Sequence, residues 1–163
     1  MIFTVAAILL AATLFARTYT TALEVIEKTF LPNSTKLQLT DEIFRHNERV
    51  ENFHYGKIKT EDNLLGYYRV GTAKSKLKDF SYILILDPAG KLIKLEILSY
   101  NEVRGKEIRR KSFLKKFQQL SIRKNDPDKI ASISGATISS RSLKLAVEAD
   151  LEVFALIIAE FEK

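Results

Sequence analysis

The stretch FSYILILDPAGKLIKLEILSY, residues 80–100, is the clearest indication of secondary structure in the chain. Its first part, Phe80 to Leu86, is rich in leucine, β-branched and aromatic residues, which favours a buried strand. The next four residues, Asp-Pro-Ala-Gly, have proline and glycine where a β-turn accepts them. From Lys91 to Tyr100 apolar and charged residues then alternate, which predicts a second strand with one face in water. The stretch therefore predicts an antiparallel hairpin, and the residues expected on the buried face of its second strand are Ile93, Leu95 and Ile97.

The segments around this hairpin predict a mixed α+β domain. We expect a strand at residues 64–70, a short helix that Ser112 caps, and a long helix from about Ser139 to Glu162, where apolar residues recur at helical spacing. Upstream, Thr40 is expected to cap a helix to about Val50, with two acidic residues in its first turn. The predicted fold class is therefore an N-terminal hydrophobic helix, an antiparallel sheet with packed helices, and a long C-terminal helix.

The composition narrows the possible functions. The chain has 163 residues, of which 46% are hydrophobic and 28% are charged, as in a globular protein. Because it contains no cysteine, we exclude disulfides, cysteine-ligated zinc, thiol nucleophiles and iron–sulfur clusters. The two histidines, His46 and His54, are expected at the surface with no role in metal binding. Any redox chemistry must then reside on a bound cofactor.

The positive charge is concentrated in one segment. The formal net charge is +6, and Arg104 to Lys124 contains nine basic residues against one acid, Glu107, whereas the remaining chain has 17 basic and 19 acidic residues. A basic segment of this kind suits an anionic cofactor, an acidic partner protein or anionic lipid. Nucleic-acid binding is not expected, because aromatic residues do not interleave with the basic ones as a base-stacking surface requires.

The N-terminus begins with an uncharged apolar run, IFTVAAILLAATLFA, at residues 2–16. As a helix this run is about 22 Å long, shorter than the roughly 30 Å of a bilayer core, but the helix can continue through residues 17–26. The run fits a signal-anchor, or a cleaved signal peptide, although no basic residue precedes it and the cleavage positions are poor. A buried helix of a soluble domain is the third alternative. We expect residues 1–26 to be the anchor or signal peptide and residues 27–163 to be the folded domain.

A hydroxyl-rich segment, IASISGATISSR at residues 130–141, is the part of the chain that suggests chemistry. A Ser-Gly-Ala-Thr turn at the start of a helix offers free backbone N–H groups and hydroxyl donors at the positive end of the helix dipole. Gly135 has no side chain and Ala136 only a methyl group, so a large ligand can approach the backbone of the turn. The segment therefore predicts an anion site, most simply for phosphate. The alternative is that Ser139 or Ser140 only caps the final helix.

The motif Ser134-Gly135-Ala136-Thr137, followed by Ile-Ser-Ser-Arg, resembles that of the FMN-binding domains in the flavin subunits of the Nqr and Rnf ion-translocating oxidoreductases. The single-domain relatives of these subunits share it. The resemblance covers roughly residues 30 to 160 and extends to further blocks in the same order. These blocks are Leu65 to Tyr68, the hairpin from Asp79 to Tyr100, Tyr100 to Ile108, and Phe113 to Phe117.

The resemblance implies FMN as the cofactor. In this family a dedicated flavin transferase joins the threonine of the motif to the FMN phosphate as a phosphoester, so Thr137 would be the attachment residue here. The resemblance also implies an electron-carrier or oxidoreductase subunit rather than a stand-alone enzyme, with no catalytic side chain of its own. The remaining residues expected at the phosphate and ribityl end are Ser134, Gly135, Ala136, Ser139 and Ser140, and those expected near the ring or ribityl chain are Glu102 and Gly105.

Two positions depart from the family pattern. Relatives usually have an aspartate where this chain has Ala131, and the resemblance implies that the transferase recognises this acid; Asp128 lies nearby. The subunits of the large complexes have a Thr-Pro pair where this chain has Val103-Arg104. This difference indicates the branch of the family whose members are stand-alone, single-domain proteins. The alanine leaves open a second function, a non-redox or non-covalent FMN-binding or sensory module of the same fold.

Together these observations predict an extracytoplasmic, membrane-associated electron-transfer flavoprotein with FMN on Thr137. We expect it to be exported and to lie at the outer face of the cell membrane, in the periplasm if the cell is Gram-negative. The expected partners are a flavin transferase for maturation, redox proteins in or outside the membrane, and anionic lipid.

Overall fold

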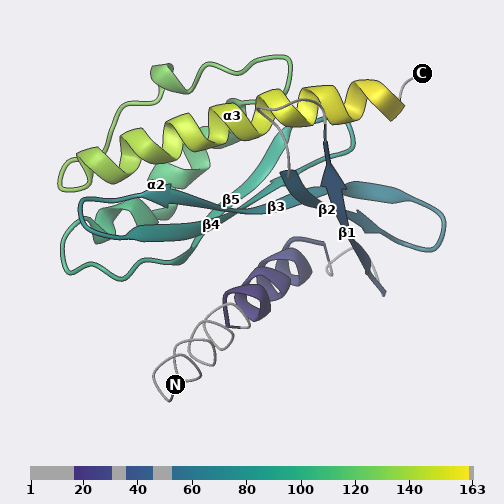
Figure 1. Cartoon of the computed structure of the whole chain (residues 1–163), viewed down its shortest axis with the longest axis horizontal. Helices are drawn as coiled ribbons and strands as arrows, with labels where there is room; N and C mark the ends of the chain where they lie inside the picture. Colours follow the sequence, from purple (N-terminus) through teal and green to yellow (C-terminus); the bar gives the residue numbers. More distant parts are fainter. Residues whose placement is uncertain (1–16, 31–35, 46–52, 162–163) are drawn as a thin grey trace, which may run out of the picture.

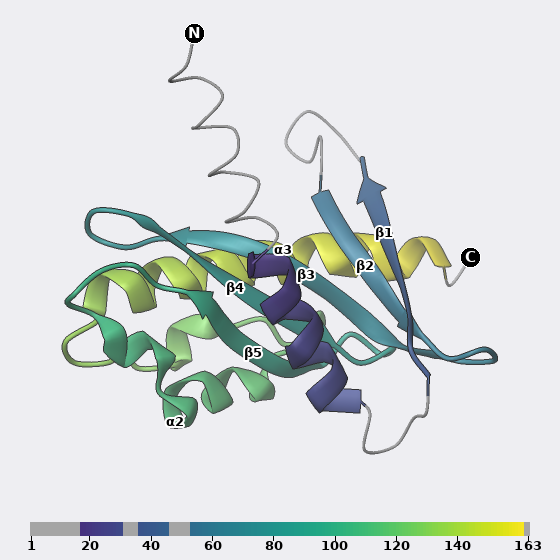
Figure 2. The same cartoon turned by 90° about the horizontal axis from the view of Figure 1, so that it is seen from below.

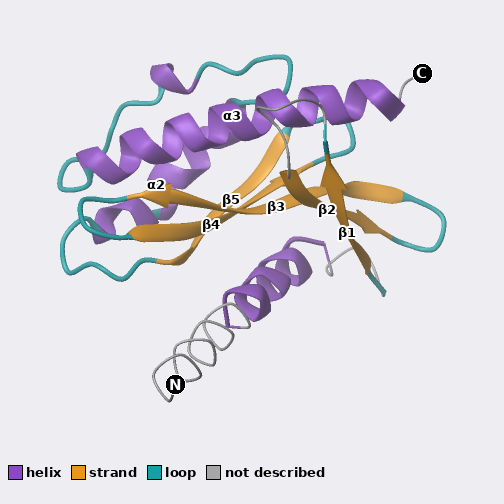
Figure 3. Ribbon diagram, viewed as in Figure 1, coloured by secondary structure: helices purple, strands orange, loops and turns teal. Residues whose placement is uncertain are grey.

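The computed structural model describes residues 17–30, 36–45 and 53–161, and in this part it has an α+β fold. The centre is one antiparallel sheet of five strands, in which each strand pairs with the next one along the chain. The strands are β1 (Gln38–Phe44), β2 (Phe53–Lys59), β3 (Leu64–Lys74), β4 (Asp79–Leu86) and β5 (Leu92–Ser99). Figure 3 shows this sheet between helical layers. The predicted antiparallel sheet is therefore confirmed.

Helices cover both faces of the sheet. The long helix α3 (Thr137–Phe161) crosses one face, and a helix formed by residues 17–30 crosses the other (Figures 1 and 2). Four shorter helices follow β5 in the chain. They are η2 (Lys106–Arg109), α2 (Lys111–Leu114), η3 (Lys115–Gln119) and η4 (Pro127–Lys129).

Two hydrophobic clusters hold these layers together, one on each face of the sheet. The larger cluster packs α3 residues such as Val147 and Phe154 against the sheet, and the rings of Phe154 and Phe53 meet edge to face at 5.4 Å. The second cluster packs Ile26 and its neighbours on the 17–30 helix against Ile83 and other residues of the opposite face. Because β4 is covered on both faces, it is apolar almost throughout rather than alternating.

The hairpin predicted at residues 80–100 is confirmed. Its turn is closed by the Gly90 N–H, which donates to the Asp87 carbonyl at 3.0 Å. The expected faces of its second strand are confirmed in part, since Leu95 and Ile97 are buried in the larger cluster and the side chains of Lys94 and Glu96 are 37% and 43% exposed. Ile93 was expected on the face of Leu95 and Ile97, but it packs with Leu98 on the second cluster. The pairing of β4 with β5 shifts register at two places, and the 17–30 helix covers the face that the alternation left for water.

The helix predicted to begin at Thr40 is wrong where the structure describes it. Residues 38–44 form β1, which pairs with β2 in a register that runs from Gln38 opposite Lys59 to Phe44 opposite Phe53. The Thr40 hydroxyl accepts a hydrogen bond from the backbone N–H of Lys57 at 3.2 Å, so it bridges two strands instead of capping a helix. The rest of the expected helix, residues 46–50, lies outside the described residues.

The other predicted elements need smaller corrections. Ser112 does not cap a helix, since α2 begins at Lys111 and Arg110 occupies the N-cap position. The final helix begins at Thr137, two residues before the expected start. The strand expected at residues 64–70 is confirmed and continues to Lys74. The apolar residues of the 112–120 segment are buried as expected, and they are Phe113, Leu114, Phe117 and Leu120.

A buried polar network ties α3 to the sheet. One carboxylate oxygen of Asp150 on α3 lies 2.8 Å from Arg69 Nε on β3, and the other accepts a hydrogen bond from the Tyr82 hydroxyl on β4 at 2.6 Å. The Arg69 guanidinium also lies 3.9 Å from the centre of the Phe53 ring. Burial raises the pKa of Asp150, while Arg69 and Tyr82 act in the opposite direction. This network fixes where α3 lies on the sheet.

Among the described residues, no helix combines the length and the apolar character needed to cross a membrane. The apolar run at residues 2–16, for which the N-terminal hydrophobic helix was predicted, lies outside the described residues. The helix at residues 17–30 continues from it in the sequence, and its buried residues Ala22, Val25 and Ile26 belong to the second cluster.

Candidate functional site

The hydroxyl-rich segment forms the turn that begins α3. The Ala136 N–H donates to the Ile133 carbonyl at 3.1 Å, and Gly135 has a left-handed backbone with φ of +84°. The first hydrogen bond of the helix runs from the Ser140 N–H to the Ala136 carbonyl at 2.8 Å. The three preceding N–H groups therefore have no helical acceptor four residues back. They are donors at the positive end of a helix of 25 residues, which suits an anion.

The segment divides into an exposed and a buried part. Ser134, Gly135 and Thr137 are exposed, so the Thr137 side chain is accessible at the first residue of α3. Ser139 and Ser140 are buried in the first turn of the helix. The Ser140 hydroxyl donates to the Thr137 carbonyl at 3.1 Å. The alternative that either serine caps the helix is wrong, because both lie inside it.

A second loop, residues 100–107, packs against this turn. The hydroxyl groups of Tyr100 and Ser139 are hydrogen-bonded at 3.0 Å, and the Tyr100 hydroxyl also donates to the Arg104 carbonyl at 3.1 Å. Gly105, with φ of +85°, is the close-approach point, because a Cβ there would be 2.3 Å from the Tyr100 hydroxyl oxygen and 3.7 Å from Ser139 Oγ. The structure therefore brings Gly105 and Ser139, two of the expected site residues, next to each other.

Glu107 is a residue of this loop that the prediction did not place in the site. A Cβ at Gly135 would lie 3.1 Å from the carboxyl carbon of Glu107, so this side chain lies against the Ser-Gly-Ala-Thr turn. Tyr100 was not named as a site residue either, and it links the loop to α3. Both residues belong to the Tyr100 to Ile108 block, so the sequence signal was present, but their contacts depend on the tertiary fold.

Glu102 binds a different part of the structure. Its carboxylate accepts hydrogen bonds from the backbone N–H groups of Leu77 and Lys78, both at 2.8 Å, and from the Ser75 hydroxyl. The Ser75 hydroxyl and the Leu77 N–H lower the pKa of Glu102 below its ordinary value. Glu102 thus holds the turn between β3 and β4 against the 100–107 loop, and its approach to a flavin ring stays a prediction.

Exposed apolar side chains surround these two loops. Leu77 is 80% exposed in the turn that Glu102 holds, and the next residue after Glu102, Val103, is 89% exposed. Ile138, directly after Thr137, is 53% exposed. Contiguous exposed apolar side chains can mark a binding surface. Exposed basic residues lie in or next to the 100–107 loop and the first turn of α3, and they are Arg104, Lys106, Arg109, Arg110 and Arg141.

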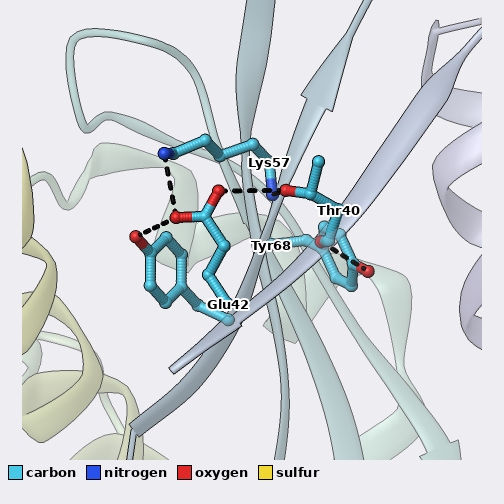
Figure 4. Close-up of polar contacts among 5 residues, drawn as sticks. Thr40, Glu42, Lys57 and Tyr68 are labelled. Carbon is cyan, nitrogen blue, oxygen red and sulfur yellow. Dashed lines mark hydrogen bonds and ion pairs between the residues drawn. The ribbon is translucent and has the colours of Figure 1, made fainter. Parts of the chain in front are cut away.

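A separate cavity of about 710 Å³ lies between the start of the 17–30 helix and strands β1 to β3. Figure 4 shows the polar cluster there: Glu42 binds Lys57 Nζ at 2.9 Å, the Tyr55 hydroxyl at 2.8 Å and the Thr40 hydroxyl at 3.2 Å. Burial raises the pKa of Glu42, but these partners outweigh it and leave the pKa below 4.5. On the other side the Tyr68 hydroxyl contacts the Thr40 carbonyl oxygen at 3.4 Å. The cluster is internally paired, and we treat it as structural.

The described residues contain no group of three or more histidine, aspartate or glutamate side chains that could hold a metal ion. His54 is exposed on β2, and His46 lies outside the described part of the chain. Ala131, where relatives usually have an acid, is exposed, and the nearby Asp128 lies 3.5 Å from Lys144 Nζ. The donors at the start of α3 are thus N–H groups and hydroxyls, which fit a phosphate rather than a metal.

Comparison with known proteins agrees with this donor set. The family model of the FMN-binding domain matches residues 78–152, which run from β4 through the 100–107 loop and the Ser-Gly-Ala-Thr turn into α3. A search of curated proteins found no match for the chain. The match includes the glycine-containing turn, the open N–H groups and the exposed hydroxyls, which are donors that suit a phosphate. Over residues 78–152, therefore, the chain carries a domain of the FMN-binding domain family, and its cofactor is FMN.

Proposed function

We propose that this protein is an electron-transfer flavoprotein that carries FMN at the start of α3, as a phosphoester on Thr137. The observation that supports this most directly is the position of Thr137. Its side chain is exposed at the first residue of α3, beside a left-handed glycine and the open N–H groups of the first turn. A phosphate on this hydroxyl would be next to the strongest anion site of the turn.

Several groups of the turn would bind the phosphate together. The N–H groups of the first turn and the exposed Ser134 hydroxyl are the available donors, while Gly135 leaves room for the Glu107 side chain, which lies against the turn. Ser139 is buried, so it contributes its backbone N–H, and its hydroxyl positions the 100–107 loop through Tyr100. Bound FMN supplies the redox chemistry, and the protein positions and tunes it.

Attachment requires only the Thr137 hydroxyl from this chain. One bond forms between Thr137 Oγ and the flavin phosphorus, the hydroxyl loses its proton, and a leaving group departs from the phosphorus. A flavin transferase acting on an activated flavin nucleotide would supply that leaving group. The protein's contribution is to present the hydroxyl in an exposed and rigid turn.

The exposed apolar residues Leu77, Val103 and Ile138 are the candidates for contact with the flavin ring. Leu77→Ser and Val103→Ser should weaken FMN binding and change the flavin absorbance bands. Leu145→Ser is the matched control, because Leu145 is an exposed apolar residue of α3 two turns beyond the site. Equal effects of all three substitutions on FMN binding would contradict this assignment.

We further propose that the protein acts at the extracytoplasmic face of the membrane, with residues 2–16 as a retained anchor. The support comes from the 17–30 helix, whose residues Ala22, Val25 and Ile26 are buried against the sheet. Cleavage after Ala22 would remove part of this packing and uncover apolar residues of the sheet, whereas cleavage after Ala16 would leave residues 17–30 in place. The packing therefore supports a mature protein that keeps residues 17–30. The redox partners would then be proteins in or outside the membrane, with anionic lipid as a further contact.

The second candidate function is a non-redox or non-covalent FMN-binding or sensory module. Ala131 favours it, because relatives usually have an acid at that position. The non-covalent form of this module is distinguished from the first function by whether the flavin stays on the protein after denaturation.

The test is the intact mass of the protein after expression with a flavin transferase and an export signal. The proposal predicts the added mass of one attached FMN, lost in Thr137→Val and kept in the control Thr72→Ala, which changes an exposed threonine on β3. Unmodified wild-type protein that binds added FMN reversibly would support the second function. Unmodified protein that binds no FMN would contradict both.

A further inference from the structure

Strand β5 is the last strand of the sheet, and its outer edge is only partly covered. At its beginning the Leu92 N–H donates to the Leu120 carbonyl at 3.1 Å, and the Gln118 side chain donates to the Ile93 carbonyl at 2.7 Å. The following residues, 94–97, line a cavity of about 250 Å³. An open strand edge is a template for pairing with another extended chain.

The opposite wall of this cavity comes from the helices that follow β5. We call the cavity the β5 groove, and its cations are Lys94, Arg109, Lys111 and Lys115. Its one acid, Glu96, is already bound by Lys94 at 3.0 Å. The other three cations are exposed, and no ion pair with them occurs in the part of the chain that the structure describes. The groove therefore has three positive charges available to an anionic ligand.

The floor of the groove is apolar. Leu95 and Ile97 of β5 and Leu114 of α2 line it, and all three belong to the larger core cluster. No aromatic side chain lines the groove, so it offers nothing on which a nucleic-acid base could stack. An apolar floor with cations along its walls fits a peptide that has both apolar and acidic side chains.

We propose that the β5 groove binds an extended acidic segment of a partner protein. The segment would add to the edge of β5 as a further strand, place apolar side chains on the floor, and direct carboxylates to Arg109, Lys111 and Lys115. A lipid headgroup would use the cations alone, whereas a peptide also uses the strand edge and the floor. The proposal does not depend on FMN, because none of these residues belongs to the Ser-Gly-Ala-Thr turn.

The experiment measures binding of a fluorescein-labelled peptide of alternating glutamate and valine to the full chain by fluorescence anisotropy. The groove variant is Lys111→Glu with Lys115→Glu. The matched control is Lys116→Glu with Lys124→Glu, which makes the same charge change at exposed residues of the same basic segment outside the groove. We expect the groove variant to bind about tenfold more weakly and the control to lose less than about threefold. Urea unfolding checks that both variants are folded, and Lys111→Gln with Lys115→Gln replaces the groove variant if it is not.

A second peptide tests pairing with the strand edge. It has the same charges but a proline in place of the central valine, which removes a backbone donor and disfavours an added strand. We expect it to bind about tenfold more weakly than the first peptide. Three results would overturn the proposal: equal binding of the two peptides, equal loss in the groove and control variants, or failure of wild-type protein to bind the peptide while it binds phosphatidylserine vesicles through the groove lysines.

Discussion

The contact between Gly105 and Tyr100 makes a quantitative prediction about the loop that packs on the Ser-Gly-Ala-Thr turn. Gly105 has φ of +85°, and an alanine there would place its Cβ 2.3 Å from the Tyr100 hydroxyl oxygen. The left-handed backbone alone costs about 1–2 kcal/mol for a residue with a Cβ. Moving the Tyr100 hydroxyl would also break its hydrogen bonds to Ser139 and Arg104, each worth about 0.5–1.5 kcal/mol. Gly105→Ala should therefore destabilise the protein by about 2–5 kcal/mol.

A double-mutant cycle separates the two contributions. Tyr100→Phe removes the hydroxyl that the new methyl group would strike, so in that background Gly105→Ala should cost only the backbone strain of about 1–2 kcal/mol. The measurement is the free energy of unfolding in urea for wild type, both single variants and the double variant. Gly90→Ala is the control: Gly90 is also left-handed, with φ of +79°, but a Cβ there would meet Ile122 and not Tyr100, so its cost should be the same in both backgrounds. Equal costs of Gly105→Ala in the two backgrounds would refute the contact.

Two further predictions concern the polar clusters. Arg69→Met leaves the buried carboxylate of Asp150 without its cation and should lower the free energy of unfolding by about 3–5 kcal/mol. Tyr82→Phe removes one hydrogen bond to a charged group and should cost less, about 1.5–3 kcal/mol. Urea unfolding measures both costs, and the reverse order would contradict this prediction. The pKa of Glu42 is lowered in the folded protein, so its stabilising contribution is present above pH 4.5 and is lost as the pH falls through the folded pKa. Lys57→Met should therefore reduce the loss of stability between pH 7 and pH 3, and an unchanged dependence on pH would exclude this role for the pair.

Local patterns predicted the hairpin well and β1 badly, for a physical reason. The hairpin at residues 80–100 is closed by a contact between neighbours in the chain, Asp87 and Gly90, which a short window contains. Around Thr40 a hydroxyl followed by two acids has the pattern of a helix start. The partner that makes this segment a strand is β2, whose pairing is not visible in that window.

The buried face of β5 was missed for a related reason. Alternation in the strand predicts one covered face, but it does not reveal a helix from a distant part of the chain. The 17–30 helix covers the second face, and its residue Ile26 packs in the same cluster as Leu98 and Ile93. The apolar run at residues 2–16 predicts an anchor or signal segment. That pattern does not indicate that the following helix, residues 17–30, packs on the sheet.

The candidate site was partly predictable. The density of hydroxyls and the glycine in the turn pointed to an anion site at the start of α3, and the structure has a helix start there. The burial of Ser139 and Ser140 agrees with helical spacing, since buried Leu143 lies four and three residues after them and buried Val147 lies four residues after Leu143. The position of Glu107 against Gly135 did not follow, because it depends on how η2 packs on the turn.

The most direct test of the central proposal is to locate the flavin by mass spectrometry after digestion with trypsin. Cleavage after Lys129 and after Arg141 releases residues 130–141, which contain Thr137 and four serines. The account predicts that flavin fluorescence follows this peptide and that fragmentation places the FMN on Thr137. An FMN on one of the serines or on any other peptide, or a peptide 130–141 without flavin from protein matured with the transferase, would contradict it.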